Sequence, residues 1–393
     1  MRNWKLILLS SIIFAGCKKP YNPPATTSAG SYLVVGGTIS SGTDSTDIVL
    51  ARTVNLSSTV TLNPVLNAIV SVQSDQNIDY PLYGTANGNY VSAGLNLDNA
   101  HTYRLSIKIN NEQYYSDYVP VLNAPPIDSI HYSITNNGIN IYSDAHDPTN
   151  AVKYYRWDYQ ETWIFHSNYD SDFISNGDTV LGRPSNNQIY TCWRSDTSST
   201  IILNSSAKLA KDVIANNPIT SITSTSEKLG SGYSILLHQY ALTPAAYSFW
   251  VNLKKNTEQL GGIFDAQPSE INGNLHSATN PLEPVIGYVS IGSTTSKRIF
   301  IYAKQLPAWL PTPAYPNCTL DTELYVFYPQ GSKTPVNQVN KFINYNKGAS
   351  IDPLIPVASI GMPGSPPIGY SASSRACVDC TLRGTNKQPP FWK

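Results

Sequence analysis

The stretch TYRLSIKI, residues 102–109, decides the fold class of the chain. Its apolar residues, Tyr103, Leu105, Ile107 and Ile109, alternate with polar ones. This period of two is typical of a strand with one buried face, because successive side chains point to opposite sides of a sheet. We therefore expect a β-strand here that packs against an apolar core.

Similar short segments surround this strand and are separated by turn residues. They are YLVVGGTIS (32–40), DIVLARTV (47–54), NAIVSVQS (67–74), NYVSAGL (89–95) and QYYSDYVPV (113–121). Short strands at this spacing are typical of a sandwich of about seven strands. The stretch LNLDNAHTYRL also has the pattern of a tyrosine corner, so Tyr103 is expected to bond to upstream backbone and to have no catalytic role. The sequence predicts an Ig-like β-sandwich over residues 32–124.

The segment PVLNAPPIDSI is rich in proline and marks the boundary to a second domain. After it, SIHYSITNNGINIYS predicts a hairpin, with Asn137-Gly138 as its tight turn. Farther on, GYVSIGSTTSKRIFIY has a strand, turn, strand pattern. These patterns predict a larger mainly-β domain over residues 125–393, ending in a tail that contains cysteines.

One clear helix interrupts this second domain. LTPAAYSFWVNLKKNTEQLGG predicts a helix over about residues 243–260, with Thr243 as its N-cap and Pro244 in its first turn. Gly261 is a suitable residue to end it. The fold class is therefore mainly β with a helical insertion.

The stretch KYYRWDYQETWIFHS begins the most informative part of the second domain. As a strand it places five aromatic residues on one face: Tyr155, Trp157, Tyr159, Trp163 and Phe165. The other face carries Tyr154, Arg156, Asp158, Gln160 and His166. Glu161 falls on the aromatic face, where an unpaired carboxylate is costly to bury. It is either an acid of raised pKa or the partner of an arginine such as Arg194 or Arg298.

The first seventeen residues, MRNWKLILLSSIIFAGC, have the pattern of a secretory leader. Basic residues precede an apolar run that is too short to span a bilayer, and the run stops at Gly16-Cys17. Small residues followed by cysteine resemble a lipobox, in which Cys17 is acylated, although Phe14 stands where Leu or Val is usual. The alternative is an ordinary signal peptide. Residues 18–31 read as a flexible tether.

The leader predicts export and lipid attachment at Cys17, and the composition agrees with an exported, β-rich protein. The chain has zero formal net charge and only 13% charged residues. This composition argues against nucleic acid as a partner. No hydrolase, metalloprotease or phosphate-binding motif occurs, so we predict no catalytic residue and no cofactor.

Two segments concentrate oxygen and imidazole ligands. SDAHDPTN brings together Asp144, His146, Asp147 and Asn150. NYDSDFISNGD contains Asp170, Asp172, Asn176 and Asp178, without the register or closing glutamate of an EF-hand loop. Because Asp and Asn are common in turns, both segments are predicted to be solvated turns, and no metal site is predicted.

Four cysteines remain after Cys17, namely Cys192, Cys318, Cys377 and Cys380. An even count in an exported chain favours two disulfides over a zinc site or a redox centre. Four cysteines allow three pairings, and the sequence does not choose among them. Bonds from Cys377 and Cys380 to Cys192 and Cys318 are favoured, because long loops constrain the unfolded chain most.

Several long tracts resemble a known family. They are YYRWDYQETW, YTCW, GYSILLHQYALTPAAYSFWVNLKKNTEQLGGIFDAQPSEINGNL, GYVSIGSTTSKRIFI and CVDCTLRGTNKQPPFW. In this order they resemble the Bacteroidetes lipoprotein family known as domain of unknown function 4249. The resemblance implies an envelope role, because members are typically encoded near TonB-dependent outer-membrane receptors. Together with the leader it implies a lipid-anchored protein of the outer membrane, with its periplasmic or surface orientation left open. It supplies no catalytic residues.

Two functional hypotheses follow from these observations. The favoured one is a non-catalytic envelope lipoprotein that serves as an accessory or binding module for a TonB-dependent receptor. The alternative is an envelope hydrolase acting on peptide or glycan, with Glu161 and the cluster of Asp144, His146 and Asp147 as its acids.

Overall fold

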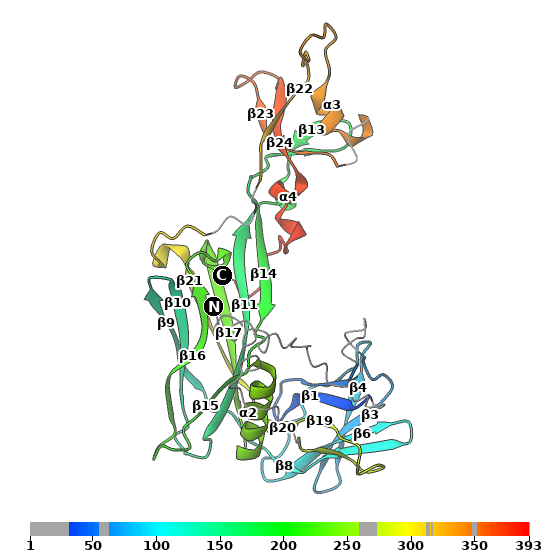
Figure 1. Ribbon diagram of the computed structural model, residues 1–393, viewed down its shortest axis with the longest axis vertical. Coiled ribbons are helices and arrows are strands. Elements are labelled where there is room, and N and C mark those ends of the chain that lie inside the picture. Colours follow the sequence, from blue (N-terminus) through cyan, green and yellow to red (C-terminus); the bar gives the residue numbers. More distant parts are fainter. Residues whose placement is uncertain are drawn as a thin grey trace, which may run out of the picture.

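The computed structural model describes residues 31–54, 63–258, 273–311, 315, 317–347 and 352–392. The leader with Cys17, and all but the last residue of the tether, lie outside this range. Figure 1 shows three β-rich parts along one elongated molecule, with a sandwich at one end and a small distal unit at the other. Among the helices of the described ranges, none is long and apolar enough to cross a bilayer.

The sandwich is one eleven-stranded sheet that folds around a single apolar core. Its strands from the N-terminal segment are β1 (Leu33–Ser40), β2 (Thr46–Arg52), β3 (Ile69–Ser74), β4 (Asp79–Gly84), β5 (Asn89–Ser92), β6 (Thr102–Ile109), β7 (Glu112–Ser116) and β8 (Val119–Pro120). The predicted strands are confirmed, and β4 is an additional one. All four apolar residues of TYRLSIKI are buried in the core.

The tyrosine corner predicted at the start of β6 is present. The Oη of Tyr103 donates to the carbonyl of Asp98 at 3.1 Å and accepts from the N–H of the same residue at 2.9 Å. The ring is almost fully buried, and burial raises the pKa of the phenol. The residue thus fixes the chain entering β6, as expected for a structural tyrosine.

Three further strands of the sandwich come from a distant part of the chain. They are β18 (Leu275–Ser277), β19 (Ile286–Gly287) and β20 (Ser290–Gly292). β18 pairs with β7, whereas β19 and β20 pair in parallel with β1. The domain boundaries predicted from the sequence place these residues in the second domain, whereas their pairing places them in the sandwich. Strands of two or three residues are too short to show a period, so only their tertiary pairing reveals where they belong.

The second domain contains two antiparallel sheets over one aromatic-rich core. The first sheet has β9 (Ile127–Thr135), β10 (Gly138–His146) and β16 (Val213–Thr223). The second has β11 (Tyr154–His166), β14 (Thr191–Thr197), β15 (Ile202–Ser205), β17 (Gly232–Ala241) and β21 (Thr295–Tyr302). Short 3-10 turns are η2 (Glu227–Leu229) and η3 (Ala303–Gln305). The core is built on the aromatic face of β11, as the sequence predicts.

The hairpin of β9 and β10 is confirmed, but its turn lies one residue earlier than predicted. Thr135 pairs with Gly138, which leaves Asn136 and Asn137 as the turn. Position 138 requires glycine for a reason other than the turn. It has φ of +142°, and a Cβ there would lie 2.0 Å from the carbonyl oxygen of Ile222 in β16.

Helix α2 (Pro244–Glu258) is the predicted insertion, and the Oγ1 of Thr243 caps it by accepting from the N–H of Ala246 at 3.2 Å. Ala246 and Phe249 are its buried residues. The helix packs against β11 and β15, and Figure 1 shows it at the junction with the sandwich. The predicted stop, Gly261, lies outside the described residues.

The distal unit is formed by two small sheets and short helices. The sheets contain β12 (Phe173–Ser175) with β13 (Val180–Gly182), and β22 (Asp321–Leu324), β24 (Gly369–Ser373) and β23 (Ile355–Ile360). The helical turns are η1 (Ser185–Asn187), α3 (Gln338–Phe342), η4 (Tyr345–Lys347), α4 (Arg375–Val378) and η5 (Cys380–Leu382). Two segments far apart in the sequence, between β11 and β14 and after β21, thus meet in one unit.

Candidate functional site

Glu161 is buried on the aromatic face of β11 and is 5% exposed. Its Oε1 pairs with the ammonium of Lys228, and its Oε2 accepts from the Oη of Tyr233 at 2.9 Å. Burial and this carboxylate raise the pKa of the Tyr233 phenol. The carboxylate is therefore paired, but by a lysine and a tyrosine instead of an arginine.

The two arginines expected as partners of Glu161 have other contacts. Arg194 lies over the ring of Trp163, at 5.7 Å from its centroid. Arg298 donates to the Oγ of Ser234 at 3.0 Å and lies over the ring of Phe391. Lys228 reaches Glu161 because η2 follows β16 directly and contacts β11. This contact joins residues 67 positions apart, which no local pattern predicts.

The cluster SDAHDPTN does not converge on one point. Asp144 accepts from the N–H of Asn216 at 2.7 Å, whereas His146 contacts Asp128 at 2.7 Å. Asp147 accepts from the N–H groups of Thr149, Ala151 and Val152, which closes the turn after β10. Burial alone would raise the pKa of Asp147, but these bonds outweigh it and lower the pKa.

The second acidic segment contains strand β12 and ends in a turn. The Oδ1 of Asn176 accepts from the N–H groups of Asp178 and Thr179, and Asp178 lies 3.5 Å from the ammonium of Lys347. Throughout the described ranges, no group of three or more His, Cys, Asp or Glu side chains could hold a metal ion. The predicted turns are found only in part, because Asp144 and His146 lie in strand β10 and only Asp147 and Asn150 lie in the turn after it. The second segment contains strand β12, with a turn only after it.

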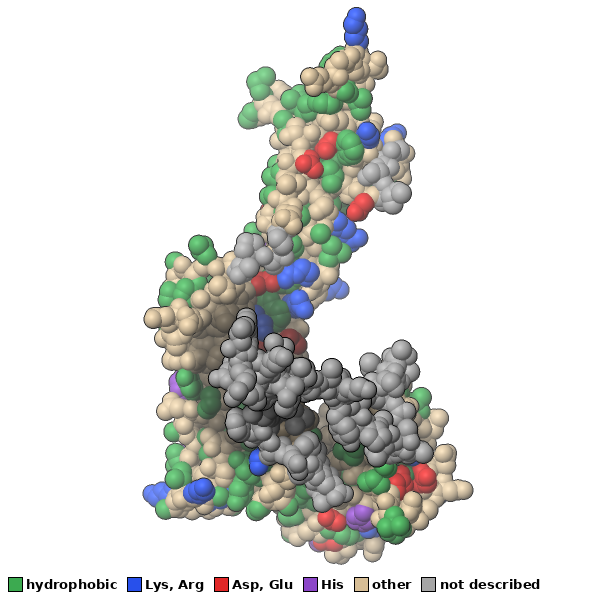
Figure 2. Space-filling view, viewed as in Figure 1, with side chains coloured by type: hydrophobic (Ala, Val, Ile, Leu, Met, Phe, Trp, Pro, Cys, Tyr) green, Lys and Arg blue, Asp and Glu red, His purple; other side chains and the backbone are tan. Residues whose placement is uncertain are grey.

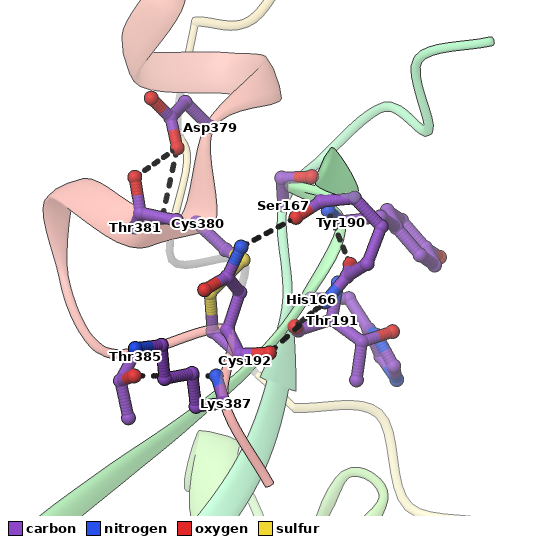
Figure 3. Close-up of a disulfide and its surroundings, with 12 residues drawn as sticks. His166, Ser167, Tyr190, Thr191, Cys192, Asp379, Cys380, Thr381, Thr385 and Lys387 are labelled. Carbon is purple, nitrogen blue, oxygen red and sulfur yellow. Dashed lines mark hydrogen bonds between the residues drawn. A yellow bond between two sulfur atoms is a disulfide. The ribbon is translucent and has the colours of Figure 1, made fainter. Parts of the chain in front are cut away.

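The four cysteines form two disulfides, Cys192–Cys380 and Cys318–Cys377. The adjacent half-cystines of the C-x-x-C pair therefore bond to two different parts of the chain. Cys377 in α4 bonds to Cys318 in the segment before β22. Cys380 in η5 bonds to Cys192 in β14, as Figure 3 shows. The side chain of Asp379 between them caps η5 by accepting from the N–H of Thr381 at 2.9 Å.

The C-x-x-C tail thus clamps the distal unit to the end of the β11–β14 ribbon. The clamp includes backbone contacts, because the N–H of Cys380 donates to the carbonyl of Ile189, and Trp193 and Thr385 form an isolated bridge. Within the tail, Trp392 is buried beside Phe300. The clamp fixes the position of the distal unit.

The distal unit exposes apolar side chains at its far end, which we call the distal tip. The tip consists of the segment after β22 and the turn between β23 and β24, with Val326, Phe327, Tyr328, Met362 and Ile368 exposed. Tyr328 is 59% exposed and Met362 is 78% exposed. Figure 2 shows hydrophobic side chains gathered on this end of the molecule. Exposed apolar patches of this kind mark interaction surfaces.

One carboxylate of the distal unit lacks a compensating partner. Glu323 in β22 is 6% exposed, and its Oε2 has no hydrogen bond among the described residues. Burial, assisted by the nearby charge of Asp321, raises the pKa of Glu323 to about 7, and Lys341 opposes the shift.

A polar cleft of about 560 Å³ lies between the sandwich and the second domain. β11 and β17 place Arg156 opposite Tyr240 and Asp158 opposite His238. Asp158 lies 2.9 Å from the Nδ1 of His238 and 3.3 Å from the Nη1 of Arg156. Burial raises the pKa of Asp158, but these two partners outweigh burial and lower it.

The sequence pattern predicts Arg156 and Asp158 on the face of β11 opposite the aromatic core, without marking them as a site. A charged pair two positions apart on a half-buried strand is the signal that could have identified them. The other side of the cleft, from β1 and β2, is brought there only by packing of the two domains.

Comparisons with known proteins give a family but no function. A family model described as domain of unknown function (DUF4249) matches residues 18–298. Among curated proteins, none matches the chain. A structure of the Yersinia pseudotuberculosis adhesin InvE is similar at 15% sequence identity and a TM-score of 0.15, covering 54% of this chain and 55% of that one. The chain thus spans about half of that adhesin, and the likeness carries no argument.

Proposed function

The chain belongs to the family described as domain of unknown function DUF4249, and from this premise we propose that it is a non-catalytic envelope lipoprotein that docks to an outer-membrane receptor. The leader supports the anchor, because it ends at Cys17 in a lipobox-like sequence. Acyl chains on that cysteine would hold the protein to the membrane.

The observation that carries this proposal is the clamped distal unit with its exposed apolar tip. β1 follows the predicted tether in the sequence, so an anchor on Cys17 would hold the molecule at its sandwich end. The tip lies at the other end of the long axis (Figure 1). Two disulfides hold it there, which favours binding because a preorganised surface loses less entropy on association.

The occupant that we propose for the tip is a TonB-dependent receptor in the same membrane. Val326, Tyr328, Met362 and Ile368 would be covered in that complex. Aromatic residues and methionine are enriched at the centres of protein interfaces. The pairing of Glu161 with Lys228 and Tyr233 supports a structural role for this acid over a catalytic one.

Photo-crosslinking in intact cells tests the proposal. A photo-reactive phenylalanine analogue replaces Tyr328 at the tip or, as a matched control, the exposed Tyr83 in β4. We expect crosslinks from position 328 to a TonB-dependent receptor, identified by mass spectrometry, and none from position 83. Cys17→Ser should release the protein from membranes and abolish the crosslink.

The hydrolase alternative gives the opposite result. In that case position 328 yields no receptor crosslink, and the purified protein turns over a peptide or glycan. Loss of that turnover in Glu161→Gln, with the fold retained, would refute the binding role. An unchanged membrane fraction and unchanged leader cleavage in Cys17→Ser would refute lipid attachment at that residue.

A further inference from the structure

We propose that the cleft between the sandwich and the second domain is a binding site for a neutral saccharide. The cleft is formed by the β1–β2 hairpin on one side and by β11, β17, β21 and α2 on the other. Its volume of about 560 Å³ lies within the range of roughly 300–1,000 Å³ that is usual for small-molecule sites. The inference is independent of the distal tip.

The lining of the cleft excludes most other ligand classes. None of its residues is aliphatic, so lipids and apolar peptides would find no surface to bury against. Asp44 and Asp47 line one wall of the cleft, and Asp158 lies on the other wall, where it contacts the guanidinium of Arg156 and the imidazole of His238. The excess of carboxylates disfavours phosphorylated and other anionic ligands. The lining suits a neutral molecule rich in hydroxyl groups.

Several polar groups in the cleft have no partner among the described residues. Ser40 is 8% exposed, and its Oγ makes no hydrogen bond there. The carboxylates of Asp44 and Asp47 also have no hydrogen bond or ion pair within the described ranges, and both residues are exposed. A buried hydroxyl without a partner is uncommon, because it loses hydration without compensation. A ligand hydroxyl could donate to Asp44 or Asp47 and bond with Ser40.

The opposite wall is held rigid before any ligand arrives. The guanidinium of Arg156 lies over the rings of Tyr240, at 4.1 Å, and Trp250, at 4.6 Å from the centroids. Asp158 fixes the imidazole of His238 through Nδ1, which leaves Nε2 to bond with a ligand. Burial and the charge of Asp158 raise the pKa of Tyr240 to about 12, so its hydroxyl remains a donor.

This combination of groups matches a sugar ring. A pyranose carries several hydroxyl groups that donate and accept at once, and the cleft offers acceptors, donors and hydroxyls on facing walls. Both walls are needed, so the site exists only when the two domains are packed together.

The test uses the purified full chain in detergent on an array of neutral oligosaccharides built from glucose, galactose, mannose, xylose, arabinose and N-acetylglucosamine. The best binder is then titrated by calorimetry. Ser40→Ala should weaken binding about fivefold without lowering the unfolding temperature, because no described bond is lost. Asp47→Asn should weaken binding about tenfold, as for loss of a hydrogen bond to a charged group.

Two matched variants serve as controls. Ser143→Ala removes another buried hydroxyl without a described partner, in β10 and away from the cleft. Asp79→Asn removes an exposed carboxylate in β4. Both should bind like the parent.

The inference is overturned if a folded parent retains no neutral saccharide, if it binds only spermidine or glucose 6-phosphate, or if Ser40→Ala and Asp47→Asn leave the affinity unchanged. Receptor crosslinking from position 328 is scored separately.

Discussion

At the scale of single residues, the surroundings of each carboxylate decide its chemistry. Glu161 is buried beside a lysine and a tyrosine, and its charge is compensated. Asp147 accepts three backbone N–H bonds, which lower its pKa. Glu323 is buried without such a partner, and its pKa rises. The carboxylate is thus a member of an ion pair in Glu161, an acceptor that closes a turn in Asp147, and an acid of raised pKa in Glu323.

Glu323 should make the stability of the distal unit depend on pH. Between its ordinary pKa and its folded pKa of about 7, the folded state binds a proton that the unfolded state does not. The free energy of unfolding therefore falls as pH rises through this window. Glu323→Gln should remove that dependence and stabilise β22 at pH 8, with little change at pH 4. Hydrogen exchange of β22 and β24 measures this, and a pH dependence that persists in the variant would contradict it.

Asp147 should have the opposite dependence. Asp147→Asn keeps the size of the side chain but replaces one acceptor oxygen with an NH₂ group, leaving backbone donors unpaired. We expect a loss of about 2 kcal/mol at pH 7. Because the folded pKa is lowered, the stabilisation is present above the ordinary pKa and disappears as pH falls through the folded value. Denaturant unfolding at pH 7 and pH 3 measures the difference, with Asp178→Asn as an exposed control.

At the scale of elements, the pairing of two strands can require a particular residue at a position where a turn pattern suggests a different reason for it. The pair Asn137-Gly138 has the composition of a tight turn, yet the turn is Asn136-Asn137. Gly138 begins β10 and pairs with Thr223 of β16 as well as with Thr135 of β9. The close approach of β16 is what requires glycine, and β16 lies about 80 residues away in the sequence.

Gly138→Ala should therefore destabilise the sheet of β9, β10 and β16. The new Cβ would overlap the carbonyl oxygen of Ile222, and alanine disfavours a φ of +142°. We expect a loss of about 2 kcal/mol or more. Gly182→Ala is the matched control, because a Cβ there meets nothing within 4 Å. Equal unfolding midpoints for the two variants would contradict the close approach.

At the scale of the whole molecule, the C-terminal tail joins parts that no local interaction connects. The two disulfides span 188 and 59 residues, so each closes a long loop. In the chain-entropy account, loops of this length stabilise the folded state by roughly 4–5 kcal/mol each, and measured values are typically lower. Among its described residues the distal unit has two small apolar clusters, and we expect it to depend on this clamp.

Removing one disulfide at a time should separate these contributions. Cys318→Ala with Cys377→Ala should loosen β22, β23 and β24 by about 3 kcal/mol and leave β11 and β14 protected. Cys192→Ala with Cys380→Ala should instead expose the junction at β14. Hydrogen exchange followed by mass spectrometry compares the two double variants. The same pattern of protection in both would contradict separate roles, and thiol counting on the unreduced parent should find the four cysteines oxidised.

The sequence alone determined the features that depend on local periodicity and composition. Alternation placed β6 and the aromatic face of β11, and the Thr243-Pro244 pair placed the start of α2. These features are local because one strand face or one helix cap is set by residues within a few positions of each other. The even cysteine count also favoured two disulfides, and lipid attachment at Cys17 stays a prediction.

The tertiary structure decided everything that joins distant residues. Lys228 as partner of Glu161, β18–β20 in the sandwich, and the facing walls of the cleft all bring together residues far apart in the chain. Such contacts depend on how whole sheets pack, and a period of two carries no information about which sheets meet. Arg156 and Asp158 could be assigned to one strand face from the sequence, but their position across from Ser40 and Asp47 required the packed domains.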